Sequence, residues 1–240
     1  MTPTELFDAG WAIHNKGGWT ARASRWRSAP AIIAQRLGLQ RWMSVPLFFG
    51  QNMIVLTGET FSRGLIAFGY AEVALTALIL RSLRPGMTFV DVGTHLGYEA
   101  MLASKLVGNT GRVISFEPQP EIFKRAKRNL AHFRQARIVN CAVGSRSGTL
   151  NIQETDLAQS AFAGTAKPNE KSIAVPMVML DEAVTECPVH FIKCDVEGAE
   201  MEVLKGATDI LPRIDRYWCL KQKCQTLIQH ERGSESSKSS

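Results

Sequence analysis

The chain has 240 residues, a formal net charge of +6 and a hydrophobic content of 45%. This length fits one α/β domain with an N-terminal extension, and the apolar share is ordinary for a buried core. No run of about 18 apolar residues occurs, which argues against a membrane span. The start, MTPTELFDAGW, lacks the basic and apolar regions of a signal peptide, so we expect a cytoplasmic protein.

Charge and cysteine patterns argue against two further kinds of partner. The positive residues are dispersed, and the run from Lys124 to Arg128 is typical of a solvated helix face. No RNA-binding signature is visible, so we expect no nucleic-acid partner. The five cysteines are scattered without a C-x-x-C pair, which predicts reduced thiols and no zinc or other metal site.

The sequence divides into three parts. Residues 1–67 are expected to form a helical and hairpin extension that acts as a cap or binds an acceptor. Within it, Val45–Phe49 and Met53–Thr57 flank a Gly-Gln-Asn turn, which predicts a β-hairpin. We expect the main α/β domain over residues 68–228 and a disordered polar tail over residues 229–240.

The stretch from residue 88 to 97 has the pattern of a ligand site. Thr88–Val92 is a short apolar run with one carboxylate, typical of a buried strand, and Tyr98–Leu106 has helical spacing. Gly93 and Gly97 permit a sharp turn between them and the close approach of a ligand. Because a helix start offers free N–H groups and a positive dipole end, this arrangement favours a nucleoside ligand.

The remaining elements alternate between extended and helical patterns. Short spacing between them predicts a doubly wound, mainly parallel sheet. The expected elements are a helix at Ala71–Leu83, a strand at Val113–Glu117, a helix at Glu121–His132, a strand at Arg137–Val143, extended segments at Gly148–Gln153 and Ser172–Val178, a short helix at Leu180–Val184, a strand at Val189–Asp195 and a helix from Glu197 onward.

Three acids stand at or just past the ends of predicted parallel strands. These are Asp91, Glu117 and Asp195, and the carboxyl edge of such a sheet is where ligands bind. Glu117 follows Asp91 by about the interval expected of a carboxylate that binds ribose hydroxyls in a nucleotide fold. Three acids in register therefore indicate a site.

The glycine spacing helps to choose the nucleoside. The dinucleotide pattern G-x-G-x-x-G admits a pyrophosphate, whereas this chain has D-x-G-x-x-x-G with His95 two positions after Gly93. An NAD-dependent reductase is therefore the weakest hypothesis, and no ATP-binding P-loop pattern is present. A ligand that carries an amino-acid ammonium and a nucleoside, such as S-adenosyl-L-methionine, fits better.

Several segments resemble the FkbM-type methyltransferases from about Phe68 to Leu211. They read FVDVGTHLGYEAMLASKLVG, GRVISFEPQPEIFKRAKRNL, NCAVGSRSGTL, LDEAV and HFIKCDVEGAEMEVLKGA. The resemblance implies a class I, Rossmann-like methyltransferase that uses S-adenosylmethionine. It implies an acceptor hydroxyl on a sugar, glycan or small molecule.

The resemblance also implies roles for particular residues. Asp91, Gly93 and Gly97 would line the methionine part of the cofactor, and Glu117 would hold the ribose. Cys141 and Ala142 would lie beside the adenine. The predicted cofactor set is completed by Thr94, Pro118 and Asp195.

A hydroxyl acceptor must lose its proton as the new bond forms, so the mechanism needs a base. Asp195 is the first candidate, Glu197 the second and His95 the third. Lys193 would either stabilise developing negative charge or neutralise the neighbouring acids. Position and the exclusion of water would supply the rest of the rate enhancement.

The C-terminal part departs from the family pattern. A class I methyltransferase sheet has seven strands, whereas the residues after Leu211 contain a strand pattern at Tyr217–Leu220 alone. We therefore expect a sheet that lacks its last strands. This departure leaves open a catalytically inert cofactor-binding protein. A less favoured alternative, an RNA methyltransferase, draws only on the net charge of +6.

Overall fold

A computed structural model describes Ile33, Leu37, Thr165 and residues 39–154, 171–186, 188–214, 217–220 and 226–229. The helix expected in the extension, most of the loop at 154–171 and nearly all of the polar tail lie outside the described residues. The division of the chain at residues 67 and 228 stays a proposal.

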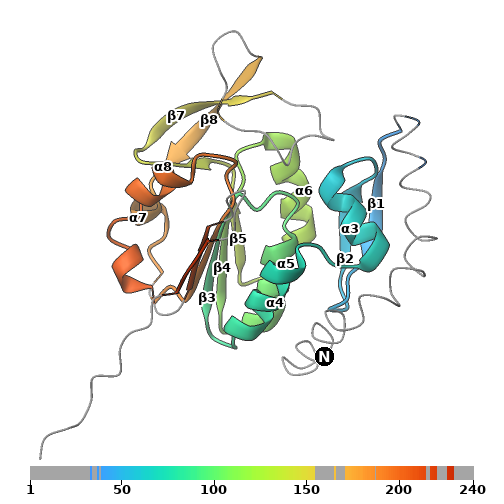
Figure 1. The fold of residues 1–240 in the computed structure, drawn as a ribbon, viewed down its shortest axis with the longest axis horizontal. Coiled ribbons are helices and arrows are strands. Elements are labelled where there is room, and N and C mark those ends of the chain that lie inside the picture. Colours follow the sequence, from blue (N-terminus) through green and yellow to red (C-terminus); the bar gives the residue numbers. More distant parts are fainter. Residues whose placement is uncertain are drawn as a thin grey trace, which may run out of the picture.

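A six-stranded sheet forms the centre of the described structure (Figure 1). The strand order is β11-β10-β9-β3-β4-β5, and all neighbours are parallel except β10 and β11. The order reverses between β3 and β9, which confirms the doubly wound, mainly parallel sheet. The strands are β3 (Thr88–Val92), β4 (Arg112–Phe116), β5 (Ala136–Val139), β9 (Phe191–Cys194), β10 (Tyr217–Leu220) and β11 (Thr226–Gln229).

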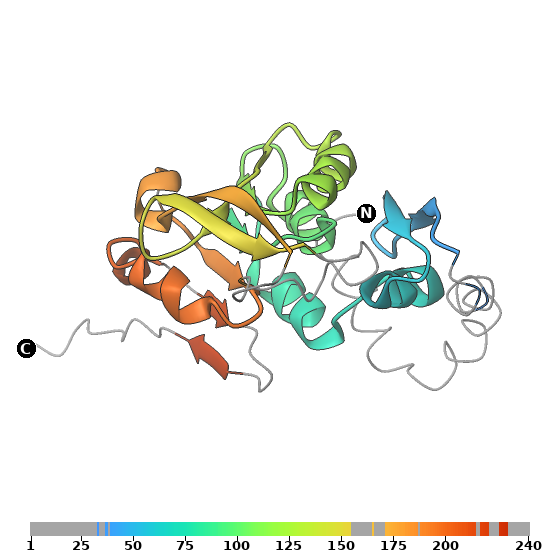
Figure 2. The same ribbon diagram turned by 90° about the horizontal axis from the view of Figure 1, so that it is seen from above.

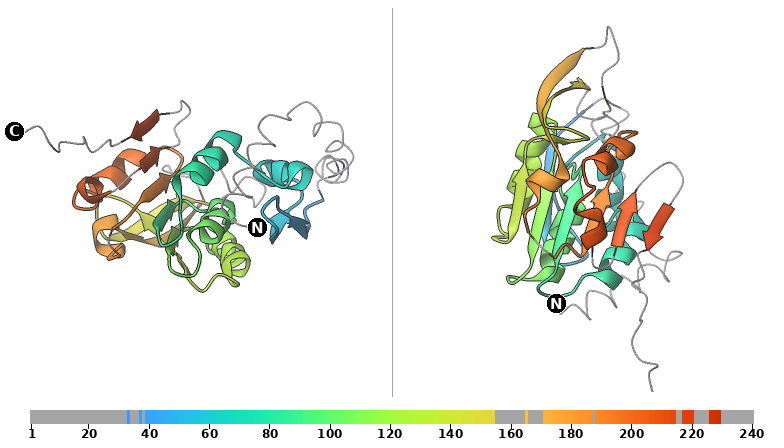
Figure 3. Two further views of the ribbon diagram at one scale, coloured as in Figure 1. Left: turned by 90° about the horizontal axis from the view of Figure 1, so that it is seen from below. Right: turned by 90° about the vertical axis from the view of Figure 1, so that its left-hand side faces the viewer.

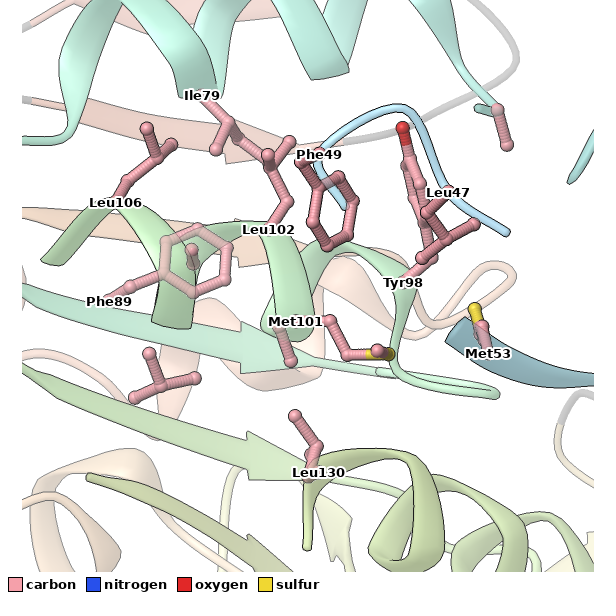
Figure 4. Packing of buried hydrophobic residues seen from close by; sticks show 14 of the residues in the cluster. Leu47, Phe49, Met53, Ile79, Phe89, Tyr98, Met101, Leu102, Leu106 and Leu130 are labelled. Atoms are coloured by element: carbon pink, nitrogen blue, oxygen red, sulfur yellow. The ribbon is translucent and has the colours of Figure 1, made fainter. Parts of the chain in front are cut away.

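Helices cover both faces of this sheet. Since side chains alternate along a strand, Phe89 and Phe191 face one hydrophobic cluster while Val90 and Ile192 face another. The first cluster packs the sheet against α4 (Val73–Ser82), α5 (Tyr98–Val107) and α6 (Pro120–Leu130). The second packs it against α7 (Leu180–Ala183) and α8 (Glu200–Lys205). Figure 4 shows side chains of the first cluster around Phe89, Tyr98 and Leu102.

The N-terminal hairpin packs into the same core as the sheet. β1 (Trp42–Pro46) and β2 (Asn52–Leu56) are antiparallel, so a hairpin forms as predicted. Its first strand lies three residues earlier than expected, and the turn runs from Leu47 to Gln51. Met53 and Val55 of β2 are buried in the cluster that contains Phe89. The hairpin and the α/β domain therefore share one hydrophobic core.

Helix α3 (Thr60–Phe68) has no counterpart among the predicted elements. Its N-cap is Glu59, whose carboxylate accepts from the N–H groups of Phe61 and Ser62 at 2.7 and 2.6 Å. It ends at Gly69, which has a φ of 74°. Glutamate is uncommon at an N-cap, so the usual start signal is missing from the sequence.

The strand predicted at Arg137–Val143 is two strands in two different sheets. β5 ends at Val139 in the central sheet, and β6 (Ala142–Val143) pairs with β8 (Ser172–Val178), which also pairs with β7 (Gly148–Gln153). The break lies at Asn140, whose amide donates to the carbonyl oxygens of Glu117 and Pro118. Figure 2 shows β7 and β8 crossing above the central sheet.

The C-terminal segment adds one more strand than the sequence predicted. β10 was expected, but β11 also forms and pairs with it antiparallel (Figure 3, right). The segment Thr226–Gln229 is only four residues long and lies between polar stretches, so its local pattern is weak. The described residues thus hold six of the seven strands that the family resemblance implies.

In the part of the chain that the structure describes, no single helix is both long and apolar enough to cross a bilayer. Helices α3 and α4 pass such a test only as a pair, by length and composition, and a bend of 66° separates them. Leu65 of α3 and Ile79 of α4 are buried in the first hydrophobic cluster.

Asn129 of α6 attaches the hairpin, and its removal should destabilise the fold. Its side chain accepts from Ile54 N–H at 2.8 Å and donates to the carbonyl oxygens of Ile54 and Leu96 at 3.1 and 2.8 Å. Asn129→Ala leaves these buried groups without partners, so we expect the free energy of unfolding to fall by about 2–4 kcal/mol. Urea denaturation measures this, with the exposed Asn151→Ala as control; equal losses in both variants would contradict the assignment.

Candidate active site

A cavity of about 260 Å³ opens at the carboxyl edge of β3, β4 and β9. This is the edge, and the position of strand-order reversal, at which open α/β sheets bind ligands. Its walls come from α3, the loops after β3, β4 and β9, and the three-stranded sheet of β6, β7 and β8, called the small sheet below. The lining includes Phe61, Glu72, Gly93, His95, Glu99, Glu117, Pro118, Cys141, Ala142, Val143, Leu150, Ile152, Lys193, Asp195 and Glu197.

A buried ion pair lies at the base of the cavity. Asp91 of β3 and Lys193 of β9 are register partners, and their side chains are 3.0 Å apart and almost completely buried. Lys193 Nζ also donates to Gly93 O at 2.6 Å. Burial lowers the pKa of Lys193, but Asp91 and then Asp195 and Glu99 oppose this, and the net pKa is raised. Lys193 therefore compensates the charge of Asp91 in the free protein, and its two predicted roles in the reaction stay predictions.

The glycine turn has a packing role beside its predicted binding role. Gly93 has a φ of 76°, and a Cβ there would lie 2.0 Å from Asp195 O, so no other residue fits. Thr94 donates its hydroxyl proton to Asp91 Oδ2 at 2.6 Å. Gly97 has a φ of 90°, and a Cβ there would face Ala126 and Leu130 of α6.

The predicted methionine-binding residues are thus not all at the surface of the cavity. Gly93 lines it, whereas Asp91, Thr94 and Gly97 lie behind its wall. Asp91 is fully buried and held by Lys193 and Thr94. Contact between these three residues and a ligand stays a prediction.

Glu117 is held in place by the backbone. Its two carboxylate oxygens accept from His95 N–H and Gln119 N–H, each at 2.9 Å. Burial raises the pKa of Glu117 to about 7, while these two hydrogen bonds and Lys193 act in the opposite direction. A carboxylate oxygen accepts more than one hydrogen bond, so both oxygens keep capacity for ligand hydroxyls. Pro118 follows it along the cavity wall.

Glu99 is a wall residue for which the sequence leaves two interpretations open, a ligand contact and an ordinary helix start. Glu99 stands in the first turn of α5 and is 3% exposed. Its Oε1 has no hydrogen-bond partner among the described residues. Burial raises the pKa of Glu99 to about 8; Lys193 lowers it, and Glu72 and Asp91 raise it further. Its sequence signal is a single carboxylate just after the glycine turn, which a helix start explains equally well.

Strained backbone is concentrated around this cavity. Among the described non-glycine residues, only Glu72, His95 and Glu197 have positive φ, at 45°, 51° and 47°. All three line the cavity, and such strain clusters at functional sites. The ring of His95 packs edge-on against Phe61 with 5.5 Å between the centroids.

One end of the cavity is apolar and comes from the small sheet. Cys141, Ala142 and Val143 line it together with Leu150 and Ile152. Burial raises the pKa of the Cys141 thiol to about 11, although Arg137 acts against this, so the thiol stays protonated. The break after β5 is what brings these residues over the edge of the sheet.

The two acids after β9 lie at the opening. Asp195 is half-buried, Glu197 is exposed, and both line the cavity. The structure thus brings together all four predicted catalytic residues, Asp195, Glu197, Lys193 and His95, around one space. Within the described ranges, no group of three His, Cys, Asp or Glu side chains is placed to hold a metal ion.

The Asp91–Lys193 pair should be required for folding because each partner compensates a buried charge. Lys193→Met leaves the Asp91 carboxylate buried and unpaired, which costs roughly 3–5 kcal/mol of unfolding free energy. The double variant Asp91→Asn/Lys193→Met should recover a large part of this loss. Urea denaturation of the single and double variants measures the coupling.

The matched control is Lys205→Met, which breaks an exposed pair with Glu202 at 2.6 Å. An exposed pair of this kind is screened by solvent and contributes little to stability. A loss for Lys193→Met as small as that for Lys205→Met would show that the buried pair does not hold β3 and β9.

Comparison with known proteins places this fold and site in a family. A family model described as the methyltransferase FkbM domain matches residues 91–234. Hexuronic acid methyltransferase AglP from Haloferax volcanii is 30% identical over 149 residues, which are 60% of this chain and 59% of that protein. A protein-L-isoaspartate O-methyltransferase from Methanothrix thermoacetophila is 40% identical over 75 residues, 31% of this chain and 34% of that protein.

Solved methyltransferase structures align more loosely. Fibrillarin from Aeropyrum pernix, with natively bound S-adenosyl-L-methionine, is 16% identical, with a TM-score of 0.38 over 57% of this chain and 46% of that one. The chain spans less than two thirds of the length of either the Haloferax or the Methanothrix relative. Since the family model matches more than half of the sequence, this chain belongs to the FkbM methyltransferase family, with a class I, α/β fold.

Proposed function

We propose that the protein transfers a methyl group from S-adenosyl-L-methionine to a hydroxyl of a small molecule, sugar or glycan. The observation that carries this proposal is Glu117, a carboxylate in the cavity wall whose two oxygens are oriented by backbone N–H groups. A carboxylate so fixed suits a pair of ribose hydroxyls. Family membership supplies the reaction class.

The cavity fits the proposed cofactor at both ends. The apolar wall from Cys141 to Val143, with Leu150 and Ile152, suits an adenine ring. The other walls are rich in carboxylates, and Lys193, their neighbouring cation, is committed to Asp91 and Gly93. An excess of carboxylates favours a ligand with positive charge and disfavours a pyrophosphate. When bound, S-adenosyl-L-methionine supplies an activated methyl group on its sulfonium.

The acceptor proposal has separate support. Asp195 and Glu197 line the cavity at its opening, where an acceptor hydroxyl can reach a carboxylate that takes its proton. The relative from Haloferax volcanii is named for methylation of a hexuronic acid. We therefore propose a sugar or glycan hydroxyl as acceptor, Asp195 as first base and Glu197 or His95 as the alternatives.

Cofactor binding is tested by isothermal titration with S-adenosylhomocysteine. We expect the purified protein to bind it and Glu117→Ala to weaken the affinity roughly 10- to 100-fold, since hydrogen bonds to a charged group are lost. Glu121→Ala, an exposed position in α6, is the control and should leave the affinity unchanged. Absence of a binding heat with folded wild-type protein would overturn the proposed function.

Catalysis is tested separately at Asp195. We expect Asp195→Asn to lower kcat about 10²- to 10⁴-fold for methyl transfer to uronic-acid-containing glycans, because the hydroxyl loses its base. Affinity for S-adenosylhomocysteine should change less than about tenfold, since the ribose contact at Glu117 is kept. Glu197→Gln is the comparison, and a larger kcat loss there would move the base to Glu197. Cofactor binding without transfer to any hydroxyl acceptor would instead favour the inert cofactor-binding alternative.

A further inference from the structure

Glu99 has the features of a ligand contact, and neither ribose binding nor proton removal from the acceptor uses it. Its carboxylate belongs to α5, a helix of ten residues, and it lines the cavity near Phe61 and Glu72. The residue is only 3% exposed, yet Oε1 has no hydrogen-bond partner in the described structure. A buried polar atom without a partner costs free energy, so such an atom beside a cavity indicates a group that is satisfied when a ligand binds.

The carboxylate that the glycine motif itself provides is not available for this contact. Asp91 is fully buried, accepts from Thr94 at 2.6 Å and pairs with Lys193 at 3.0 Å. It does not line the cavity. A cation in the cavity therefore meets Glu99 and not Asp91.

The charges around Glu99 favour an incoming cation. Lys193 of β9 is the positive neighbour, but it is already bound to Asp91 and to Gly93 O. The remaining charged or titratable groups that face Glu99 or adjoin it are Asp91 of β3, Glu72 before α4, Tyr98 of α5 and His95 of the glycine turn.

We propose that Glu99 is the counter-ion for the ammonium group of the cofactor's amino-acid end. This inference rests on the proposed function and assigns one end of that site. The ammonium would donate to Oε1 and place a full positive charge beside the carboxylate, which gives a charge-assisted hydrogen bond in a buried setting.

The proposal predicts that ligand binding changes the protonation of Glu99. In the free protein burial raises the pKa of Glu99 to about 8, so at pH 7 the carboxyl is mostly protonated. A bound ammonium favours the ionised carboxylate and lowers this pKa. Binding at pH 7 should therefore release up to about one proton from Glu99, and the affinity should rise as the pH is raised toward 8.

Two probes distinguish this inference from the proposed function. S-adenosylhomocysteine carries the ammonium, whereas 5′-methylthioadenosine keeps the nucleoside and lacks the amino acid. We expect Glu99→Gln to weaken binding of S-adenosylhomocysteine roughly tenfold or more and to leave binding of 5′-methylthioadenosine unchanged. Glu99→Asp, which keeps the charge, should recover part of the loss. The control Glu117→Ala should weaken both probes, because both contain ribose.

Titration calorimetry of the wild-type protein in buffers of different ionisation enthalpy gives a second readout that needs no variant. We expect net proton release with S-adenosylhomocysteine at pH 7, and less release with 5′-methylthioadenosine or with Glu99→Gln. If both probes bind the wild type but Glu99→Gln affects them equally or not at all, the inference is overturned and the proposed function stands. If neither probe binds the folded wild type, the proposed function itself fails.

Discussion

The buried pair between Asp91 and Lys193 is the interaction on which the rest of the site depends. It joins β3 to β9 at the position where the strand order reverses. Thr94 donates a further hydrogen bond to Asp91 Oδ2, and Lys193 donates one to Gly93 O. Burying two charges is costly unless they are paired and hydrogen-bonded, so both the register of the strands and the shape of the glycine turn are fixed by this pairing. The carbonyl of Asp195 then approaches Gly93 so closely that only glycine fits.

This pairing also determines the electrostatics of the cavity above it. Lys193 is already paired with Asp91. Among the described residues that line the cavity, there is no second lysine or arginine to compensate the carboxylates. Burial raises the pKa of Glu99 to about 8 and that of Glu117 to about 7, so the ionised form of each carboxyl is disfavoured in the free protein. A cationic ligand supplies the missing charge, whereas a pyrophosphate would add to the excess. This electrostatic argument supports the proposed cofactor independently of the glycine spacing.

The sequence predicted those features whose causes are local. Thr88–Val92 forms β3 with the expected bounds, because a short apolar run before a glycine turn is typical of a buried strand. The sequence alone does not separate a ligand contact at Glu99 from a helix start, since the difference lies in its burial and in an oxygen without a hydrogen-bond partner among the described residues. The break at Asn140 depends on hydrogen bonds to the loop after β4, and β11 depends on pairing with β10. These are tertiary interactions, which local sequence patterns do not reveal. The ion pair between Asp91 and Lys193 is another contact of this kind, and the ligand contact of Asp91 stays a prediction.

The two ends of the cavity are built by parts of the chain that lie far apart in sequence, and this separation gives the site its polarity. The break after β5 brings Cys141 and Val143 over the sheet edge and makes one end apolar. The start of α5 and the turn before α4 bring Glu99 and Glu72 to the cavity and make another part acidic. A flat ring alone would leave the acidic part uncompensated, and a simple cation would leave the apolar part empty. A ligand that joins an aromatic nucleoside to a positively charged amino acid satisfies both, so the chemistry of the walls favours one orientation of the cofactor.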